Sequence, residues 1–212
     1  MSLSGKAALV TGSTSGIGLG IAVALARNGC DVVVTGSRSE AAAQDAVAKV
    51  KASSQSRVVY KQCDLKDTSA TEEFAKEVLQ DFPNGIDILV NNAGMQYVSE
   101  VSNIPLDKWN DMLAVNITAP FIFSKYFVPK MKEKGWGRVV NISSVQAIIA
   151  HPNKTPYVTT KSGLTGFTRA LAMETARHGI TVNALCPAWT DTPRKSHNVI
   201  NLMTSWASFP ER

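Results

Sequence analysis

Cysteine is scarce in this chain. The 212 residues include three cysteines, Cys30, Cys63 and Cys186, which are odd in number and far apart. This distribution argues against a disulfide framework and predicts reduced thiols in a reducing compartment. None of the three has a neighbour at the spacing of zinc ligands, so we expect no metal site. These features predict a cytoplasmic location.

Targeting signals and long apolar runs are also lacking. Residues 1–6 lead directly into a strand pattern without a signal peptide, and we expect no segment to span a bilayer. The formal net charge is +5, and the basic residues are scattered. The densest basic cluster has the position of a helix C-terminus, where cations suit the helix dipole. It consists of Lys130, Lys132, Lys134 and Arg138. We therefore expect neither a membrane nor a nucleic acid as partner.

Strand patterns alternate with helical patterns along the chain. With 212 residues, 44% of them hydrophobic, it can form one domain with a large core. Short continuous apolar runs are typical of parallel strands buried on both faces. Strands are expected at 7–10, 31–35, 57–61, 86–90, 139–142 and from 179, with helices after the first run and at 40–52, 69–81, 106–131 and 157–176. The stretch 106–131 is expected to form one long helix or two abutting ones, bent at Pro120. The alternation predicts an α/β fold, a Rossmann-like doubly wound parallel sheet with helices on both faces.

A glycine-rich turn follows the first expected strand. Gly12, Gly16 and Gly18 stand between that strand and a helical pattern. Strand, glycine turn and helix are the context of a dinucleotide fingerprint, in which the backbone approaches the pyrophosphate and the helix N-terminus offers free N–H groups. The alternative is a tight turn without a ligand.

Tyr157 and Lys161 are four residues apart at the start of a helical pattern. Positions four apart share one helix face, so the phenol and the ammonium are expected to be neighbours. A nearby cation favours the phenolate and should lower the pKa of Tyr157 from its ordinary value of about 10. Such a pair can run acid–base chemistry on an alcohol or ketone. Ser144 stands where the strand at 139–142 ends.

Together with Asn91-Asn92-Ala93-Gly94, these motifs resemble the short-chain dehydrogenase/reductase family, over residues 6–192. The resemblance implies that Ser144, Tyr157 and Lys161 are catalytic and that Asn116 holds a water in the proton path. For Asn116, an ordinary core hydrogen bond is the alternative. It also implies that helix 106–131 joins two subunits. The implied nicotinamide-dinucleotide site comprises Gly12, Thr14, Ser15, Gly16, Ile17, Gly18, Asp64, Leu65, Asn91, Ala93, Gly94, Tyr157, Lys161, Pro187, Thr190 and Thr192. For Asp64, capping of the following helix is the alternative.

The choice of cofactor depends on the end of the second strand. An acid there favours NAD, whereas an arginine can hold the extra phosphate of NADP. The chain has no acid at this position and carries Ser37 and Arg38. No basic residue occurs among Ser13, Thr14 and Ser15, where many NADP-dependent relatives have one. We predict NAD and leave NADP open.

Within the family, the segments 94–98, 152–157 and 186–189 are similar to D-3-hydroxybutyrate dehydrogenases. That similarity implies that Gln96 and Lys154 hold the carboxylate of a short hydroxy acid, with Gln146, in place of a common histidine, and Trp189 as further substrate contacts. For Gln96 and Lys154, ordinary loop polarity is the alternative. Two other functions remain open: reduction of another carbonyl substrate such as an acyl thioester, sugar or steroid, and dinucleotide binding without efficient catalysis.

The tail departs from the family pattern. We expect a catalytic domain at 1–192 and a divergent tail at 193–212, without the last strand and C-terminal helix of the family. Because that strand covers a sheet edge in family members, we expect a homodimer and regard a tetramer as doubtful.

Overall fold

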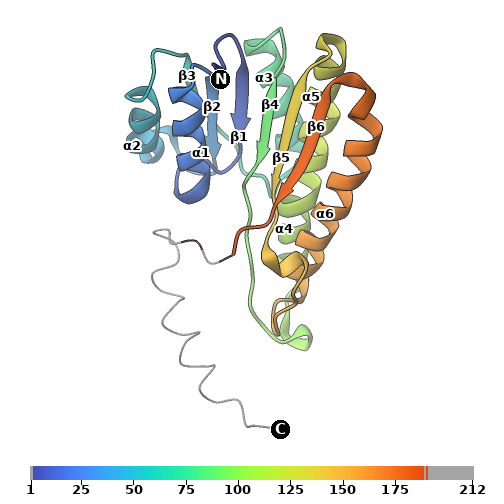
Figure 1. Ribbon diagram of the computed structural model, residues 1–212. Helices are drawn as coiled ribbons and strands as arrows, with labels where there is room; N and C mark the ends of the chain where they lie inside the picture. Colours follow the sequence, from blue (N-terminus) through green and yellow to red (C-terminus); the bar gives the residue numbers. More distant parts are fainter. Residues whose placement is uncertain (1, 189, 191–212) are drawn as a thin grey trace.

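Six parallel strands form one sheet in a computed structural model that describes residues 2–188 and 190 (Figure 1). The strand order is β3-β2-β1-β4-β5-β6. The expected tail at 193–212 lies outside the described residues, as do Trp189 and Thr192. The described part confirms the expected α/β class and the doubly wound parallel sheet. The strands are β1 (Ala7–Val10), β2 (Asp31–Gly36), β3 (Val58–Gln62), β4 (Ile88–Asn91), β5 (Gly137–Ile142) and β6 (Ile180–Leu185).

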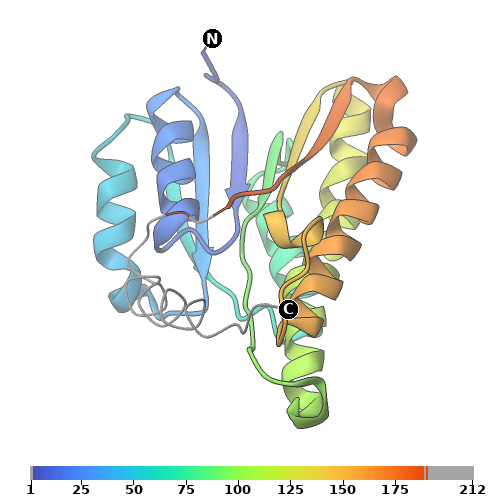
Figure 2. The ribbon, with the colours of Figure 1, turned by 60° about the horizontal axis from the view of Figure 1, so that its bottom comes forward.

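Helices cover both faces of this sheet, and each face has its own hydrophobic core. One core packs α1 and α2 against the sheet, and the other packs α3, α5 and α6 against it. Figures 1 and 2 show α1 and α2 beside the blue strands and α5 and α6 beside the yellow and orange ones. The helices are α1 (Gly16–Arg27), α2 (Glu40–Lys51), α3 (Thr68–Asp81), α4 (Leu106–Leu113), α5 (Ala119–Lys134) and α6 (Thr155–Thr175), with short turns η1 (Val101–Asn103), η2 (Ala114–Thr118), η3 (Val145–Ala147) and η4 (Ala176–His178).

The helix expected at 106–131 is continuous to Lys134 and contains a π turn. This turn, η2, separates α4 from α5, and the N–H of Ala119 donates to the carbonyl of Ala114, five residues back. Pro120 was expected to bend the helix; it stands in the first turn of α5, directly after η2. Inserted π turns are common at functional sites, and this one contains Asn116.

The same helical segment bears on the expectation that no segment spans a bilayer. By length and composition, Leu106–Lys134 could cross a membrane, whereas the sequence predicts no such segment. However, 56% of its most apolar window is buried inside the fold, against α3 and the sheet. Burial of this kind is typical of a core helix, which carries the same apolar composition.

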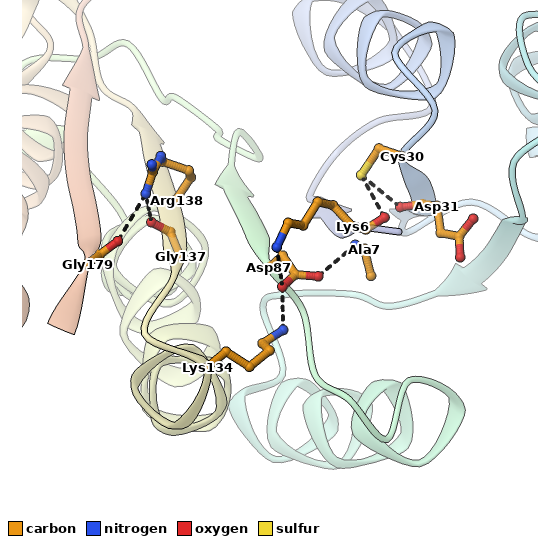
Figure 3. Close-up of polar contacts among 9 residues, drawn as sticks. All are labelled: Lys6, Ala7, Cys30, Asp31, Asp87, Lys134, Gly137, Arg138 and Gly179. Atoms are coloured by element: carbon orange, nitrogen blue, oxygen red, sulfur yellow. Dashed lines mark hydrogen bonds and ion pairs between the residues drawn. The ribbon is translucent and has the colours of Figure 1, made fainter. Parts of the chain in front are cut away.

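Ion pairs join the amino ends of the strands (Figure 3). Asp87, 5% exposed, accepts a hydrogen bond of 2.9 Å from the N–H of Ala7. It also pairs with Lys134 and lies 3.9 Å from the ammonium of Lys6. All three cysteines are unpaired. At this same end, the buried Cys30 thiol donates to the carbonyl of Lys6, and burial raises its pKa to about 12.

Candidate functional site

A cavity of about 500 Å³ lies at the opposite end of the sheet, where the parallel strands end. Open α/β sheets bind their ligands at this end because the loops that leave the strands meet there. Its lining comes from the start of α1, the segment after β4, the end of β5, η3, the start of α6 and the segment after β6. The residues expected from the sequence that line it are Ile17, Gly94, Gln96, Ser144, Gln146, Lys154, Tyr157, Lys161, Pro187 and Thr190.

Ser144 and Tyr157 both line this cavity, where the serine hydroxyl is close enough to the phenol to influence its pKa. Ser144 is the N-cap of η3, and its Oγ accepts a 3.2 Å hydrogen bond from the N–H of Gln146. Burial raises the pKa of Tyr157, and the Ser144 hydroxyl partly opposes that rise. The N–H of Gln146 therefore fixes the Ser144 hydroxyl beside a phenol that stays protonated at neutral pH.

Lys161 lies beneath Tyr157 on the next turn of α6, as the spacing predicts. Only 3% of its surface is exposed, and its Nζ lies 5.8 Å from the centroid of the Tyr157 ring. The ammonium donates a 2.7 Å hydrogen bond to the carbonyl of Ile142, at the end of β5. Burial lowers the pKa of Lys161 to about 8, against a smaller opposing effect of Cys186.

One electrostatic expectation is not met. The cation was expected to lower the pKa of Tyr157, but that pKa is raised. Loss of water around the buried phenol is the largest influence on it, and the influence that lowers it comes from Ser144. Sequence spacing fixed the proximity of the pair but carried no information on how deeply both groups are buried.

Asn116 does not line the cavity, and its side chain is fully engaged in the core. It is 0% exposed, accepts from the N–H of Met95 at 3.0 Å and donates to the Met95 carbonyl at 3.0 Å. It also donates to Thr160 Oγ1 at 2.9 Å, and Thr160 donates to the carbonyl of Tyr157. The side chain thus ties the segment after β4 to the helix that carries Tyr157. Its own carbonyl cannot receive the usual helical bond from residue 120, which is a proline without an N–H.

The glycine turn and the segment after β4 form one unit. Gly12 has φ +63° and Gly16 has φ +54°. The Asn92 amide donates to the carbonyls of Thr11 (2.8 Å) and Gly12 (3.2 Å). A Cβ on Gly18 would lie 2.4 Å from the Asn92 amide nitrogen and 2.5 Å from the Gly12 carbonyl oxygen. Glycine is therefore required where α1 packs against the two loops.

The start of α1 fits the phosphates of a dinucleotide. Ser15, the N-cap residue, makes no side-chain capping bond, and the first turn contains no acidic residue. The first N–H groups of a helix carry partial positive charge and favour an anion at this position. The turn thus offers the donors that a pyrophosphate needs, without a carboxylate that would repel it.

Other expected cofactor residues lie outside the cavity lining. Asp64 accepts from the N–H of Lys66, 3.1 Å away, and Asp67 is the N-cap of α3. The alternative assignment of Asp64 as that cap is therefore wrong. Asn91 is buried and donates to Asn141 Oδ1 at 2.7 Å, joining β4 to β5. The full set outside the lining is Gly12, Thr14, Ser15, Gly16, Gly18, Asp64, Leu65, Asn91 and Ala93.

The expected substrate contacts differ in exposure. Lys154 is 6% exposed and Gln146 is 9% exposed, whereas Gln96 is exposed. Among residues 2–188 and 190, the Oε1 of Gln146 has no hydrogen-bond partner. A buried amide oxygen without a partner is costly, so a ligand group that donates a hydrogen bond there is favoured. Trp189 and Thr192, also expected at the site, lie outside the described residues.

Several lining residues were not expected from the sequence. Apolar and small side chains do not stand out in a motif search, although most of these residues flank a motif residue. Position at the carboxyl end of a strand or in the segment that follows it is the signal that would have found them. They are Asn92, Met95, Val98, Ile142, Ser143, Val145 and Ala188.

The chain is similar to proteins of one family along most of its length. A model of the short chain dehydrogenase family matches residues 6–201, beyond the boundary expected at 192. A D-beta-hydroxybutyrate dehydrogenase of Cupriavidus necator is 44% identical over 191 residues, covering 90% of this chain and 73% of that protein. One from Rhizobium meliloti is 39% identical over 188 residues, covering 89% and 72%.

A solved structure extends the similarity to three dimensions. An NAD(P)-dependent gluconate 5-dehydrogenase from Beutenbergia cavernae, with NADP bound at low occupancy, has a TM-score of 0.88 at 32% identity. The alignment covers 97% of this chain and 81% of that one. The fold, the cavity at the carboxyl ends of the strands and the family match lead to one conclusion. The chain belongs to the short-chain dehydrogenase family, oxidoreductases that use nicotinamide dinucleotides and act on CH–OH donors.

Proposed function

We propose that this protein transfers a hydride between NAD and a short hydroxy acid, with 3-hydroxybutyrate and acetoacetate as the substrate pair. The observation that carries the proposal is the position of Lys154. This buried lysine lines the same cavity as Ser144 and Tyr157 and lies three residues before Tyr157. A short substrate whose hydroxyl meets Tyr157 would thus have its carboxylate within reach of a cation.

The proton chemistry belongs to Tyr157 and Ser144. The Tyr157 phenol donates its proton to the substrate oxygen during reduction, and its phenolate takes that proton from the substrate hydroxyl during oxidation. Ser144 donates a hydrogen bond to the substrate oxygen, which accumulates charge as the carbonyl forms. NAD supplies the hydride acceptor. Lys161 places a buried positive charge under the phenol, and Asn116 holds the helix that carries both residues.

Substrate orientation depends on the carboxylate contacts. A charge-assisted hydrogen bond from Lys154 fixes one end of the molecule, and Gln96 and Gln146 supply amide groups along the same cavity. A substrate held at its carboxylate presents its hydroxyl to Ser144 and Tyr157 in a restricted geometry. An uncharged alcohol would lack this restraint.

NAD is the proposed cofactor. The turn before α1 has no basic side chain at Ser13, Thr14 or Ser15. Two relatives that are 44% and 39% identical to this chain are D-beta-hydroxybutyrate dehydrogenases. Arg38, which is exposed, favours NADP, as does the bound NADP in the similar gluconate dehydrogenase. The backbone that carries Ser37 and Arg38 is held by the side chains of Gln62 and Tyr60.

One observation favours a second substrate type. The Oε1 of Gln146, which lacks a partner in the described part of the chain, would accept a hydrogen bond from a further hydroxyl, which 3-hydroxybutyrate lacks. A longer polyhydroxy acid such as a sugar acid would supply it. This alternative keeps the carboxylate contact with Lys154 and adds a second polar contact.

An absorbance assay of NAD and NADP against 2- and 3-hydroxy acids, gluconate and an uncharged secondary alcohol tests the proposal. We expect turnover of D-3-hydroxybutyrate with NAD, and we expect Lys154→Ala to raise its KM by about tenfold or more, since a charged hydrogen bond is worth about 1.5–3 kcal/mol. The same variant should leave the KM of the uncharged alcohol unchanged. An unaltered KM for the hydroxy acid would contradict the contact between Lys154 and the carboxylate and would indicate another carbonyl substrate.

A further inference from the structure

Asn153 has an unusual backbone conformation beside the cavity. Its φ is +63°, and it is the sole non-glycine residue with positive φ among residues 2–188 and 190. The left-handed region is unfavourable for most side chains, and asparagine and glycine tolerate it best. The Asn153 side chain is exposed and forms no hydrogen bond with the described part of the chain. The identity of this residue therefore matters through its backbone.

The left-handed backbone of Asn153 affects two neighbouring residues, Ser99 and Lys154. The carbonyl of Asn153 accepts a 2.9 Å hydrogen bond from the N–H of Ser99, so the segment after β4 is joined to the segment before α6. Figure 1 shows these segments, green and yellow-orange, at the same end of the molecule. The next residue is Lys154, the N-cap of α6, whose side chain turns inward and lines the cavity.

We infer that Asn153 is a positioning residue for Lys154. Its left-handed backbone reverses the chain between exposed Asn153 and buried Lys154, and its carbonyl locks that reversal to Ser99. Strained residues of this kind persist where the surrounding structure holds them, often beside binding sites. What Lys154 holds, the carboxylate of the substrate, rests on the proposed function; the placement of Lys154 does not.

Substitutions at Asn153 separate backbone from side-chain effects. Asn153→Gly removes the amide but keeps the left-handed conformation accessible. Asn153→Val strongly disfavours it, because a β-branched residue is an outlier there. Asn153→Ala is a milder change of the same kind. Asn103→Val is the control, an identical exchange at an exposed asparagine without positive φ.

The first experiment measures the placement of Lys154 without any enzymatic activity. Each variant is treated with a small amine-acetylating ester, and acetylation of Lys154 is followed by peptide mass spectrometry. We expect slow acetylation in the wild type, Asn153→Gly and Asn103→Val, and acetylation at least about threefold faster in Asn153→Val, with an intermediate rate in Asn153→Ala. Equal rates in all variants would overturn the inference. Unfolding curves identify any variant whose reactivity reflects global unfolding.

The second experiment measures how the placement affects the substrate. For D-3-hydroxybutyrate we expect Asn153→Val to raise KM about five- to tenfold and to change kcat less than twofold, because uniform binding is lost. In Asn153→Gly, KM should stay within about twofold of the wild-type value. In the Lys154→Ala background, Asn153→Val should add nothing, since two residues that act through one contact are not additive.

The two proposals can fail separately. If Lys154→Ala leaves KM unchanged, the carboxylate site of the proposed function is wrong, and the acetylation rates still decide the role of Asn153. If Lys154→Ala raises KM and the effect of Asn153→Val is fully additive to it, Asn153 acts elsewhere and the inference is overturned.

Discussion

Burial of Lys161 has a cost in stability. The lysine retains 3% exposure, and its ammonium donates to the carbonyl of Ile142. Loss of water around the charge lowers its pKa from 10.5 to about 8. A cation that is hard to bury is kept beneath Tyr157, next to the cavity, where perturbed pKa values are typical of a functional site. We expect the stability lost by burying Lys161 to be offset by a gain in catalytic activity, because costly buried charges are retained for activity rather than for folding.

The pH dependence of stability tests this view. Below pH 8, Lys161 is charged in both states, so the folded state bears the full cost of burial. Between pH 8 and 10.5, the folded lysine loses its proton first, and stability rises with pH relative to a variant without the lysine. We expect Lys161→Met to be more stable at pH 7 by on the order of 3 kcal/mol, with the difference shrinking toward pH 10. Urea unfolding at several pH values measures it.

A stability difference that is independent of pH would contradict this account, because it would show that lysine burial imposes no cost linked to protonation. The same variant should lose most of its turnover. Gain of stability together with loss of activity distinguishes a functional lysine from a structural one.

Two of the glycines in helix α1, Gly18 and Gly20, have different surroundings. A Cβ on Gly18 would collide with the Asn92 amide and with the backbone of Gly12, whereas a Cβ on Gly20 would meet nothing within 4 Å. Both residues lie within the same helix, two positions apart. The pair therefore provides a test in which helix propensity changes equally and packing changes at one site.

We expect Gly20→Ala to stabilise the protein by about 0.5–1 kcal/mol, because alanine is the better helix former. Gly18→Ala should destabilise it by about 1–3 kcal/mol through overpacking. It should also weaken NAD binding, since the two loops at the start of α1 are pushed apart. Urea unfolding and a fluorescence titration with NAD check both effects. Equal behaviour of the two variants would show that close packing at Gly18 is unimportant.

Elements and motif residues could be predicted from the sequence to different degrees. The alternating apolar runs predicted all six strands, with bounds shifted by a few residues, because buried parallel strands read as continuous hydrophobic stretches. The π turn at Asn116 could not be predicted, since it depends on contacts with Met95 and Thr160 from distant segments. The burial that raises the pKa of Tyr157 likewise arises only when the strands and helices pack together.

The whole molecule separates stability from chemistry. The cavity lies at the carboxyl ends of the strands, whereas the Asp87 cluster lies at their amino ends (Figure 3). Asp87 connects the start of β1, the segment before β4 and the end of α5, through Ala7, Lys6 and Lys134. Because the cluster lies at the other end of the strands from the cavity, changes in it should affect folding and leave the site unaltered.

We expect Asp87→Asn to lower the free energy of unfolding by about 2 kcal/mol, since the two lysines lose their counter-ion but stay partly hydrated. The asparagine oxygen can still accept from Ala7. The values of kcat and KM should stay within about twofold of the wild type. Urea unfolding and steady-state kinetics on one preparation measure both, and a large change in KM without a change in stability would contradict the separation.

The central claim is that Tyr157 transfers the proton in a hydride-transfer reaction. It is tested most directly by NAD-dependent oxidation of D-3-hydroxybutyrate, measured side by side for the wild type and Tyr157→Phe. The variant keeps the ring and loses the hydroxyl, so kcat should fall by about 10²–10⁴-fold, while the dissociation constant of NAD stays within about twofold. A Tyr157→Phe protein that retains most of the wild-type rate would contradict the account.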